Sequence, residues 1–310
     1  SISLTDRILL NLGVRWDSYQ TEGTNLALDA TTGAITGTPV PERKLDFVNY
    51  QAGLVFKPTE ASSLYVSYAT SSTPPTVSTG DQNTATNGQG TGNLADTILD
   101  PEESESFEIG AKANVFGDRL ALSAAAFHLT RRNAAILVDV GVYEQAGEVE
   151  VQGIELGVSG NITPLWQVFG GYTYQDSELV RGAVTTTGAP PVVVPNAFEG
   201  LPLANTPEHS ASLFTTYRLL PKLTLGGGVY YVSDSFGGNQ GGAGGGANRI
   251  YAPEYTRVDA FASYDVTDRA SLQLNVQNVG DERYILRTNG VHHADPAPGR
   301  SASLTLNLRF

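Results

Sequence analysis

The chain has 310 residues, and only 16% of them are charged, against roughly 25% in soluble globular domains. It contains no Cys, which excludes a disulfide scaffold, and it has no apolar run long enough for a helix across a membrane. The formal net charge of −13 argues against nucleic acid as a partner, because phosphate binding needs clustered Lys and Arg.

Apolar and polar residues alternate along most of the chain. Successive side chains of a strand point to opposite faces, so each alternating segment has one apolar and one polar face. The pattern predicts about twelve strands, preceded by the end of another at residues 1–4. In chain order these strands cover residues 7–22, 44–56, 61–70, 103–116, 119–138, 142–160, 165–179, 207–219, 223–236, 254–266, 269–280 and 299–310.

The connections between these strands alternate between short and long. The short ones contain turn residues, as at Gly117-Asp118 and Thr267-Asp268. The long ones cover residues 23–42, 71–100, 180–206, 237–253 and 281–298, and one short hairpin near 139–141 interrupts that series. In an up-and-down sheet, this alternation places the short turns at one end and the long loops at the other.

Two fold classes share this alternation, a soluble β-sandwich and a transmembrane β-barrel. Most expected strands have about 10–18 residues, whereas soluble strands have roughly five or six and a barrel strand needs about 9–11 to cross a bilayer. Aromatic residues near strand ends, such as Trp16, Trp166 and Tyr264, are typical of the boundary between lipid and water. We predict an all-β, antiparallel, up-and-down transmembrane β-barrel, with residues 1–310 in a single domain; a secreted soluble β-sandwich adhesin is the alternative.

A more specific signal comes from six segments that occur in a fixed order. They are Leu99-Asp100-Pro101-Glu102 with Ser106-Phe107-Glu108-Ile109-Gly110-Ala111-Lys112, Phe127-His128-Leu129-Thr130-Arg131-Arg132-Asn133, Gln152-Gly153-Ile154-Glu155-Leu156, Asn205-Thr206-Pro207-Glu208-His209, Asn278-Val279-Gly280-Asp281-Glu282-Arg283-Tyr284, and the end of the chain from Pro298 to Phe310. Together they resemble the β-barrel of TonB-dependent siderophore receptors. The nearest subgroup is the receptors for catecholate- or ferrichrome-type iron chelates.

The resemblance implies a particular place in a larger protein. The family's barrel has about 22 strands and is filled by an N-terminal plug domain. The resemblance therefore implies the C-terminal portion of such a barrel, with the plug outside this chain, and the absence of Met fits a piece of a longer protein. The implied function is uptake of a ferric siderophore across the outer membrane of a Gram-negative bacterium, with the TonB complex acting through the plug.

The resemblance also implies where the ligand binds. The family captures iron chelates with residues of the loops and the upper barrel, where Arg supplies charge to an anionic chelate and Tyr stacks on it. The ferric siderophore is the expected ligand, with no covalently bound cofactor. By position, the candidate contacts are Tyr143, Arg181, Arg249, Tyr251, Tyr284 and Arg287. The alternative is an aromatic girdle for the tyrosines, and loop solubility or lipid-headgroup pairing for the arginines.

The last strand carries a second candidate function. Leu304, Leu306, Leu308 and the terminal Phe310 alternate with polar residues. This row resembles the sorting signal read by the outer-membrane assembly machinery, and it would also form the lipid face of the last strand. Lipid and lipopolysaccharide are therefore expected partners, together with that machinery.

Three other groups of residues contain types that can bind metals or phosphate, but their sequence context argues against such binding. His292-His293 with Asp295 lacks metal-ligand spacing, the Gly237–Gly246 run lacks the Lys-Ser/Thr of a phosphate loop, and the acidic residues Asp100, Glu102, Glu103 and Glu105 fit a solvated strand entry. We predict no metal site. Since the sequence has no Gly-x-Ser-x-Gly and no paired carboxylates with a plausible partner, we also predict that the chain is not an enzyme.

The sequence also allows a function of a different class. A complete small outer-membrane barrel could act as a passive channel or as a membrane-embedded hydrolase. The channel would require closure at about twelve strands. The hydrolase would require a Ser, His and acid set on the inner face, and no residue group suggests one.

Overall fold

The computed structural model describes residues 1–28, 31–74, 101–139, 142–195, 199–237, 250–289 and 293–309. A thirteen-stranded antiparallel sheet dominates these residues. Its strands are β1 (Ile2–Thr5), β2 (Ile8–Leu28), β3 (Ile35–Thr59), β4 (Ser62–Thr73), β5 (Glu102–Val115), β6 (Leu120–Asp139), β7 (Val142–Thr163), β8 (Trp166–Arg181), β11 (His209–Leu220), β12 (Leu223–Val232), β15 (Tyr255–Thr267), β16 (Ala270–Gln277) and β19 (Ser301–Leu308).

Three two-stranded pairs lie in the connections at one end of the sheet. They are β9 (Thr185–Thr187) with β10 (Val192–Val194), β13 (Ser235–Phe236) with β14 (Tyr251–Ala252), and β17 (Ile285–Asn289) with β18 (His293–Pro296). Among the described residues, no helix has the length and apolar character needed to cross a membrane.

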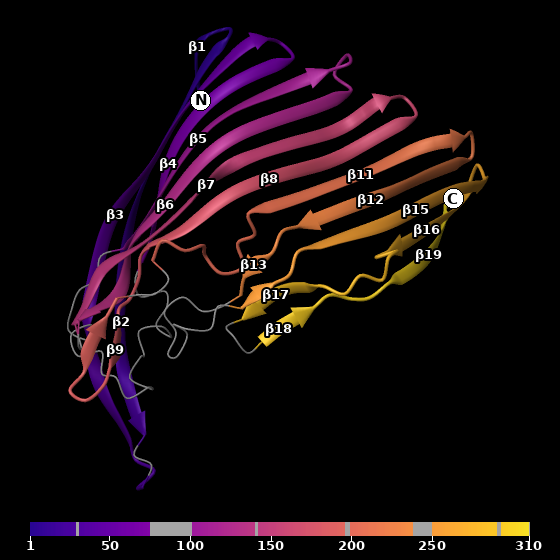
Figure 1. Cartoon of the computed structure of the whole chain (residues 1–310). Helices are drawn as coiled ribbons and strands as arrows, with labels where there is room; N and C mark the ends of the chain where they lie inside the picture. Colours follow the sequence, from indigo (N-terminus) through magenta and orange to yellow (C-terminus); the bar gives the residue numbers. More distant parts are fainter. Residues whose placement is uncertain are drawn as a thin grey trace.

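The large sheet is a single curved wall in which every strand pairs with its neighbours in the chain (Figure 1). The prediction of an all-β, antiparallel, up-and-down arrangement is therefore confirmed. The short turns lie at the end of the wall that also holds both chain termini, and the strand ends that the longer connections join lie at the opposite end. We call that opposite end the rim.

The first long connection differs from the prediction. Residues 23–42 were expected to form a loop, but most of them extend β2 and β3, which stay paired from Ile8↔Phe56 to Leu28↔Ile35. The Gly, Asn and Pro residues of this stretch suggested a loop, and cross-strand pairing overrides that preference. Pro39 is tolerated because β3 pairs with β4 only from Gln51 onwards, so no second neighbour requires its missing N–H.

One face of the wall is apolar and exposed. Large side chains that a soluble protein would bury are open on this face, among them Ile109 at 54% and Leu156 at 48% exposure. They share one register across the sheet, since Leu54, Val66, Ile109, Ala126 and Ile154 are successive cross-strand partners. The opposite, polar face carries side chains such as Glu108 and Glu155, one residue along from Ile109 and Ile154. We refer to these as the apolar face and the polar face.

Aromatic side chains mark the two edges of the apolar face. Near the short turns, Trp166 and Tyr217 are cross-strand partners. Toward the rim, Tyr68 pairs with Phe107, and Tyr174 lies on the same strand as Trp166. Eight residues separate Trp166 from Tyr174, which is about 26 Å along the strand and comparable to the apolar band of about 25 Å on a membrane barrel.

This division of faces predicts opposite effects for the same substitution. Leu156→Arg places a charge in the middle of the apolar band and should lower the free energy of unfolding from lipid vesicles by about 2–4 kcal/mol. Ser123→Arg, on the polar face opposite Gly157, should cost less than about 1 kcal/mol. Urea titration of the protein in vesicles measures both, and equal losses would contradict the assignment of the two faces.

Candidate functional site

Described parts of the connections that follow β8, β12 and β16 lie at the rim, and the last of them is bonded to Arg257 and Asp259 on the polar face of β15. We call them the rim segments: residues 199–209, the β13–β14 pair with its flanks (233–237 and 250–255), and residues 278–289. Figure 1 shows β13, β17 and β18 gathered at this end of the wall. A small apolar cluster joins two of these segments to the wall: Phe236, Leu201 and Leu203 of the rim segments pack with Leu179 on β8 and Val149 on β7.

Asn278 fixes the start of the last rim segment. Its side chain is 2% exposed, and its Oδ1 accepts the N–H of Glu282 at 2.8 Å while its Nδ2 donates to the Glu282 carbonyl at 2.9 Å. Its own N–H donates to the carboxylate of Asp259 on β15 at 2.8 Å. Asn278 has φ of 52°, a left-handed conformation that Asn tolerates better than most residues. The turn is thereby bonded to the barrel wall.

Arg257 binds the same turn from the other side. Its guanidinium pairs with Asp259 at 3.1 Å, donates to the Tyr284 hydroxyl at 3.3 Å and lies 4.1 Å from the ring centre of Tyr230. Tyr284 in turn stacks on Tyr255, with ring centres 4.0 Å apart. Arg, with a planar charge and several donors, is suited to serve all of these partners at once.

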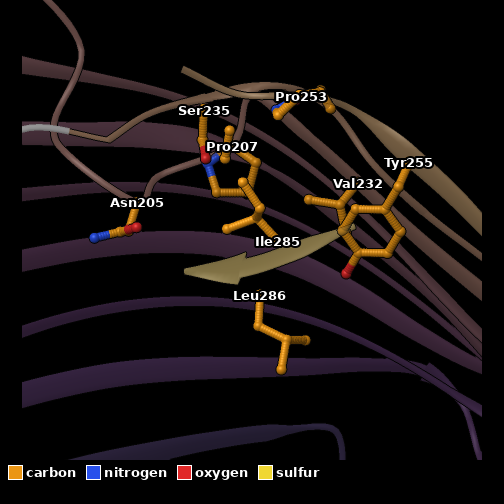
Figure 2. Close-up of a pocket in the computed structure, with 10 residues that line it drawn as sticks. Asn205, Pro207, Val232, Ser235, Pro253, Tyr255, Ile285 and Leu286 are labelled. Atoms are coloured by element: carbon orange, nitrogen blue, oxygen red, sulfur yellow. The ribbon is translucent and has the colours of Figure 1, made fainter. Parts of the chain in front are cut away.

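A small cavity opens between these rim segments. Its volume is about 50 Å³, and Figure 2 shows Tyr255, Ile285 and Leu286 around it, with Asn205, Pro207 and Ser235 at the other side. This volume admits only a few water-sized groups. A larger groove of about 300 Å³ lies on β2, β3 and β4, with Arg15, Asn49 and Gln51 among its lining residues. The second value is at the lower end of the size of small-molecule pockets.

The six predicted ligand contacts differ in their exposure and in the partners that their side chains have. Tyr251 is 52% exposed on β14, and Arg287 on β17 is exposed and paired with Asp295 at 2.6 Å. Tyr284 is only 8% exposed, with its ring on Tyr255 and its hydroxyl bonded to Arg257. Arg181 is exposed at the end of β8, where it pairs in register with Glu148.

The other two candidates are only partly visible. Tyr143 lies on β7 opposite Leu137, but its side chain is outside the described residues, and Arg249 is outside them altogether. The structure therefore gathers Tyr251, Tyr284 and Arg287 on rim segments that touch one another, and ligand contact by any of the six stays a prediction.

The remaining sequence candidates have clear positions. Leu304, Leu306 and Leu308 point out from the apolar face of β19 and are 69%, 58% and 55% exposed, whereas Phe310 is outside the described residues. Their role as an assembly signal stays a prediction. His293 is exposed, and His292 lies outside the described part. No group of three or more possible metal ligands occurs among the described residues.

Two of the acidic residues, Glu102 and Glu105 at the start of β5, are paired with arginines. Glu102 accepts a hydrogen bond from Arg131 at 2.9 Å, while Arg132 bridges Glu105 at 3.4 Å and Glu148 at 2.9 Å. These pairs lie beyond the apolar band, toward the rim. The hydrogen bond to Glu148 raises the pKa of Arg132 above its usual value. Asp100 lies outside the described residues.

Sequence reasoning missed the residues that organise the rim. Arg257 and Asp259 alternate on an ordinary strand, and no local signal distinguishes them. Asn205 and Asn278 are the first residues of two of the six segments that resemble the receptor family. Those two segments were the only sequence signal that pointed to these asparagines.

Residues 1–279 match the family described as TonB dependent receptor-like, beta-barrel. The chain belongs to this family. PiuA of Acinetobacter baumannii, a probable TonB-dependent siderophore receptor, is 38% identical over 310 residues, which is 100% of this chain and 39% of that protein. Fiu of Escherichia coli K12, a catecholate siderophore receptor, is 32% identical over 325 residues, or 100% of this chain and 40% of Fiu.

Solved receptor structures agree with these relatives. The crystal structure of PiuA superposes with a TM-score of 0.82 at 37% identity, covering 99% of this chain and 41% of the other. The closed form of Fiu gives 0.80 at 31% identity, covering 99% and 43%. The chain thus spans about two fifths of the length of the receptors it matches.

Membership in the TonB-dependent receptor family settles several predictions. Its members are outer-membrane proteins of Gram-negative bacteria, so the predicted location and the transmembrane barrel are confirmed. The apolar face is the lipid face, and the polar face lines the lumen. The relatives are receptors and not enzymes, as predicted. The soluble adhesin is wrong, and the complete small barrel has no support because the chain matches part of much larger barrels.

The bonds of Asn278 predict a local effect on the rim of the TonB-dependent receptor. Asn278→Ala leaves the Glu282 N–H without its buried acceptor, which should cost about 1–3 kcal/mol of local stability. Trypsin should then cleave after Arg283 and Arg287 about five to one hundred times faster than in the unmodified protein. Asn307→Ala, on an exposed residue of β19, serves as the matched control. Equal cleavage rates in all three proteins would contradict the role of Asn278.

Proposed function

We propose that the receptor containing this chain takes up a ferric siderophore of the catecholate or ferrichrome type, with energy supplied through the TonB complex. The observation that carries the proposal is the similarity over the whole chain to PiuA and Fiu, of which Fiu is named a catecholate siderophore receptor. In this proposal the chain supplies the lumen wall and part of the ligand-facing rim. The plug that the TonB complex would act on belongs to the rest of the receptor.

The chemistry of the rim supports an anionic iron chelate. A ferric tris-catecholate carries negative charge and flat aromatic rings, and the chain as a whole is acidic, with a net charge of −13. Capture therefore depends on local cations and aromatic rings. Arg287 and Arg181 are exposed at the rim, and Tyr251 presents an open ring next to Phe236, with centres 6.2 Å apart.

The remaining partners follow from the same architecture. The lipid face would contact lipid and, on the outer side, lipopolysaccharide. The exposed row Leu304, Leu306 and Leu308, with Phe310, would be read by the outer-membrane assembly machinery during insertion.

Growth under iron limitation tests the ligand class. A strain that lacks its own siderophore receptors and carries the full-length gene should grow on a ferric catecholate, and growth should disappear when TonB is deleted. Ferrichrome, a hydroxamate chelate, is the comparison substrate. Growth on neither chelate would refute the proposed ligand class, and growth that persists without TonB would refute energised uptake.

The ion pair between Arg287 and Asp295 allows a sharper test of charge at the rim. Arg287→Gln should weaken binding of ferric 2,3-dihydroxybenzoate about three- to tenfold, because it removes a cation and leaves Asp295 uncompensated. Asp295→Asn should tighten binding, because it frees that cation. Fluorescence titration of the full-length receptor measures both constants, with Arg309→Gln at the far end of the wall as control. A change of the same sign in both variants would indicate a structural effect and contradict ligand contact.

A further inference from the structure

A side-chain clasp joins two rim segments that are distant in sequence. The Nδ2 of Asn205 donates to the carbonyl of Thr288 at 2.9 Å, and its Oδ1 accepts the N–H of Thr288 at 2.9 Å and the hydroxyl at 3.0 Å. The two residues are 83 positions apart. An Asn side chain that bonds both the N–H and the C=O of one residue replaces a strand pairing and fixes the orientation of β17.

The third rim segment is included in the same clasp. The backbone N–H of Asn205 donates to the carbonyl of Phe236 at 2.8 Å. One residue further on, a Cβ added to Gly237 would lie 2.6 Å from the Thr288 hydroxyl oxygen, so only glycine lets the β13 segment approach so closely. Asn205 itself has φ of 56°, and Thr288 is 6% exposed. The three segments meet at a junction where Phe236, Gly237 and Thr288 are buried and Asn205 is exposed.

The small rim cavity depends on this arrangement. Asn205, Ser235 and Leu286 line it, and they come from the three different segments (Figure 2). The apolar cluster around Phe236, which is 2% exposed, lies below the same junction. The hydrogen bonds of Asn205 and the apolar packing around Phe236 connect the three segments directly to one another.

We propose that these rim segments form one prefolded unit that is closed before the chelate arrives, and that Asn205 is the positioning residue that keeps it closed. The unit acts as a fixed wall against which the ligand docks, and movement during capture belongs to other parts of the receptor. A prefolded wall avoids the entropy cost of ordering three loops upon binding. The inference rests on the proposed function for its ligand, but its central claim concerns the ligand-free receptor.

Amide hydrogen exchange of the ligand-free, full-length receptor tests the prefolded unit directly. The N–H groups of Asn205 and Thr288 should exchange slowly and should not slow further on adding ferric 2,3-dihydroxybenzoate. Asn205→Ala should speed exchange at Thr288 about tenfold or more, since the N–H of this buried residue loses its acceptor, while Asn114→Ala at the opposite end of the wall should not. Fast exchange in the unmodified ligand-free receptor, with protection only after chelate is added, would overturn the proposal.

A covalent lock tests whether the clasp stays closed during transport. The chain has no Cys, so the double variant Asn205→Cys with Thr288→Cys introduces the only thiols of this part of the receptor, and a short bifunctional thiol reagent can join them. The cross-linked double variant should bind and transport the chelate at least as well as the same variant without the linker. Loss of uptake that returns when a reducible version of the linker is cleaved would show that the clasp opens and would overturn the proposal. If the unmodified receptor binds no chelate, the proposed ligand class fails, whereas the exchange result still decides the clasp.

Discussion

Backbone hydrogen bonding between neighbouring strands is the constraint on which the rest of this structure depends. In lipid, an unpaired N–H or C=O group costs several kcal/mol, so every strand must be paired along the length that faces the membrane. The unbroken order from β1 to β19 meets that requirement for each interior strand. Because pairing occupies the backbone, the side chains divide between lipid on one face and the lumen of the barrel on the other. The low charge content of the chain follows from this division.

At the rim, outside the lipid, side chains supply hydrogen-bond partners for the backbone N–H and C=O groups. The rim segments have little regular pairing, and the side chains of two asparagines, the buried Asn278 and the exposed Asn205, take its place. Asn278 bonds a turn to itself and, through Asp259, to the wall, whereas Asn205 bonds one loop to another. Both adopt left-handed backbone conformations, so one residue type supplies the turn geometry and the hydrogen bonds together. Under the proposed function, fixed rim segments of this kind would give the receptor a ligand-facing surface whose ordering cost is met during folding.

Much of the wall was predictable because the alternation of side chains is a local property. The row of Leu304, Leu306 and Leu308 predicted an exposed apolar face on the last strand, and the structure shows it. The extension of β2 and β3 through residues 23–42 was not predictable, since Gly and Pro there favour a loop and only the partner strand overrides them. Among the candidate ligand contacts, Tyr284 was selected for its position near a loop, but its ring and hydroxyl are engaged by Tyr255 and Arg257. Its sequence neighbourhood could not reveal partners about thirty positions away.

The sequence by itself determined the fold class, the order of the strands, the face that meets lipid and, through six short segments, the receptor family. These properties depend on side-chain period and on local motifs, which are readable along the chain. Only the tertiary structure decided how the rim is assembled. The partners of Asn205, Arg257 and Gly237 lie up to 83 residues away, and such contacts arise from the curvature and register of the whole wall. A local sequence pattern cannot show which residues so far apart in the chain will be in contact.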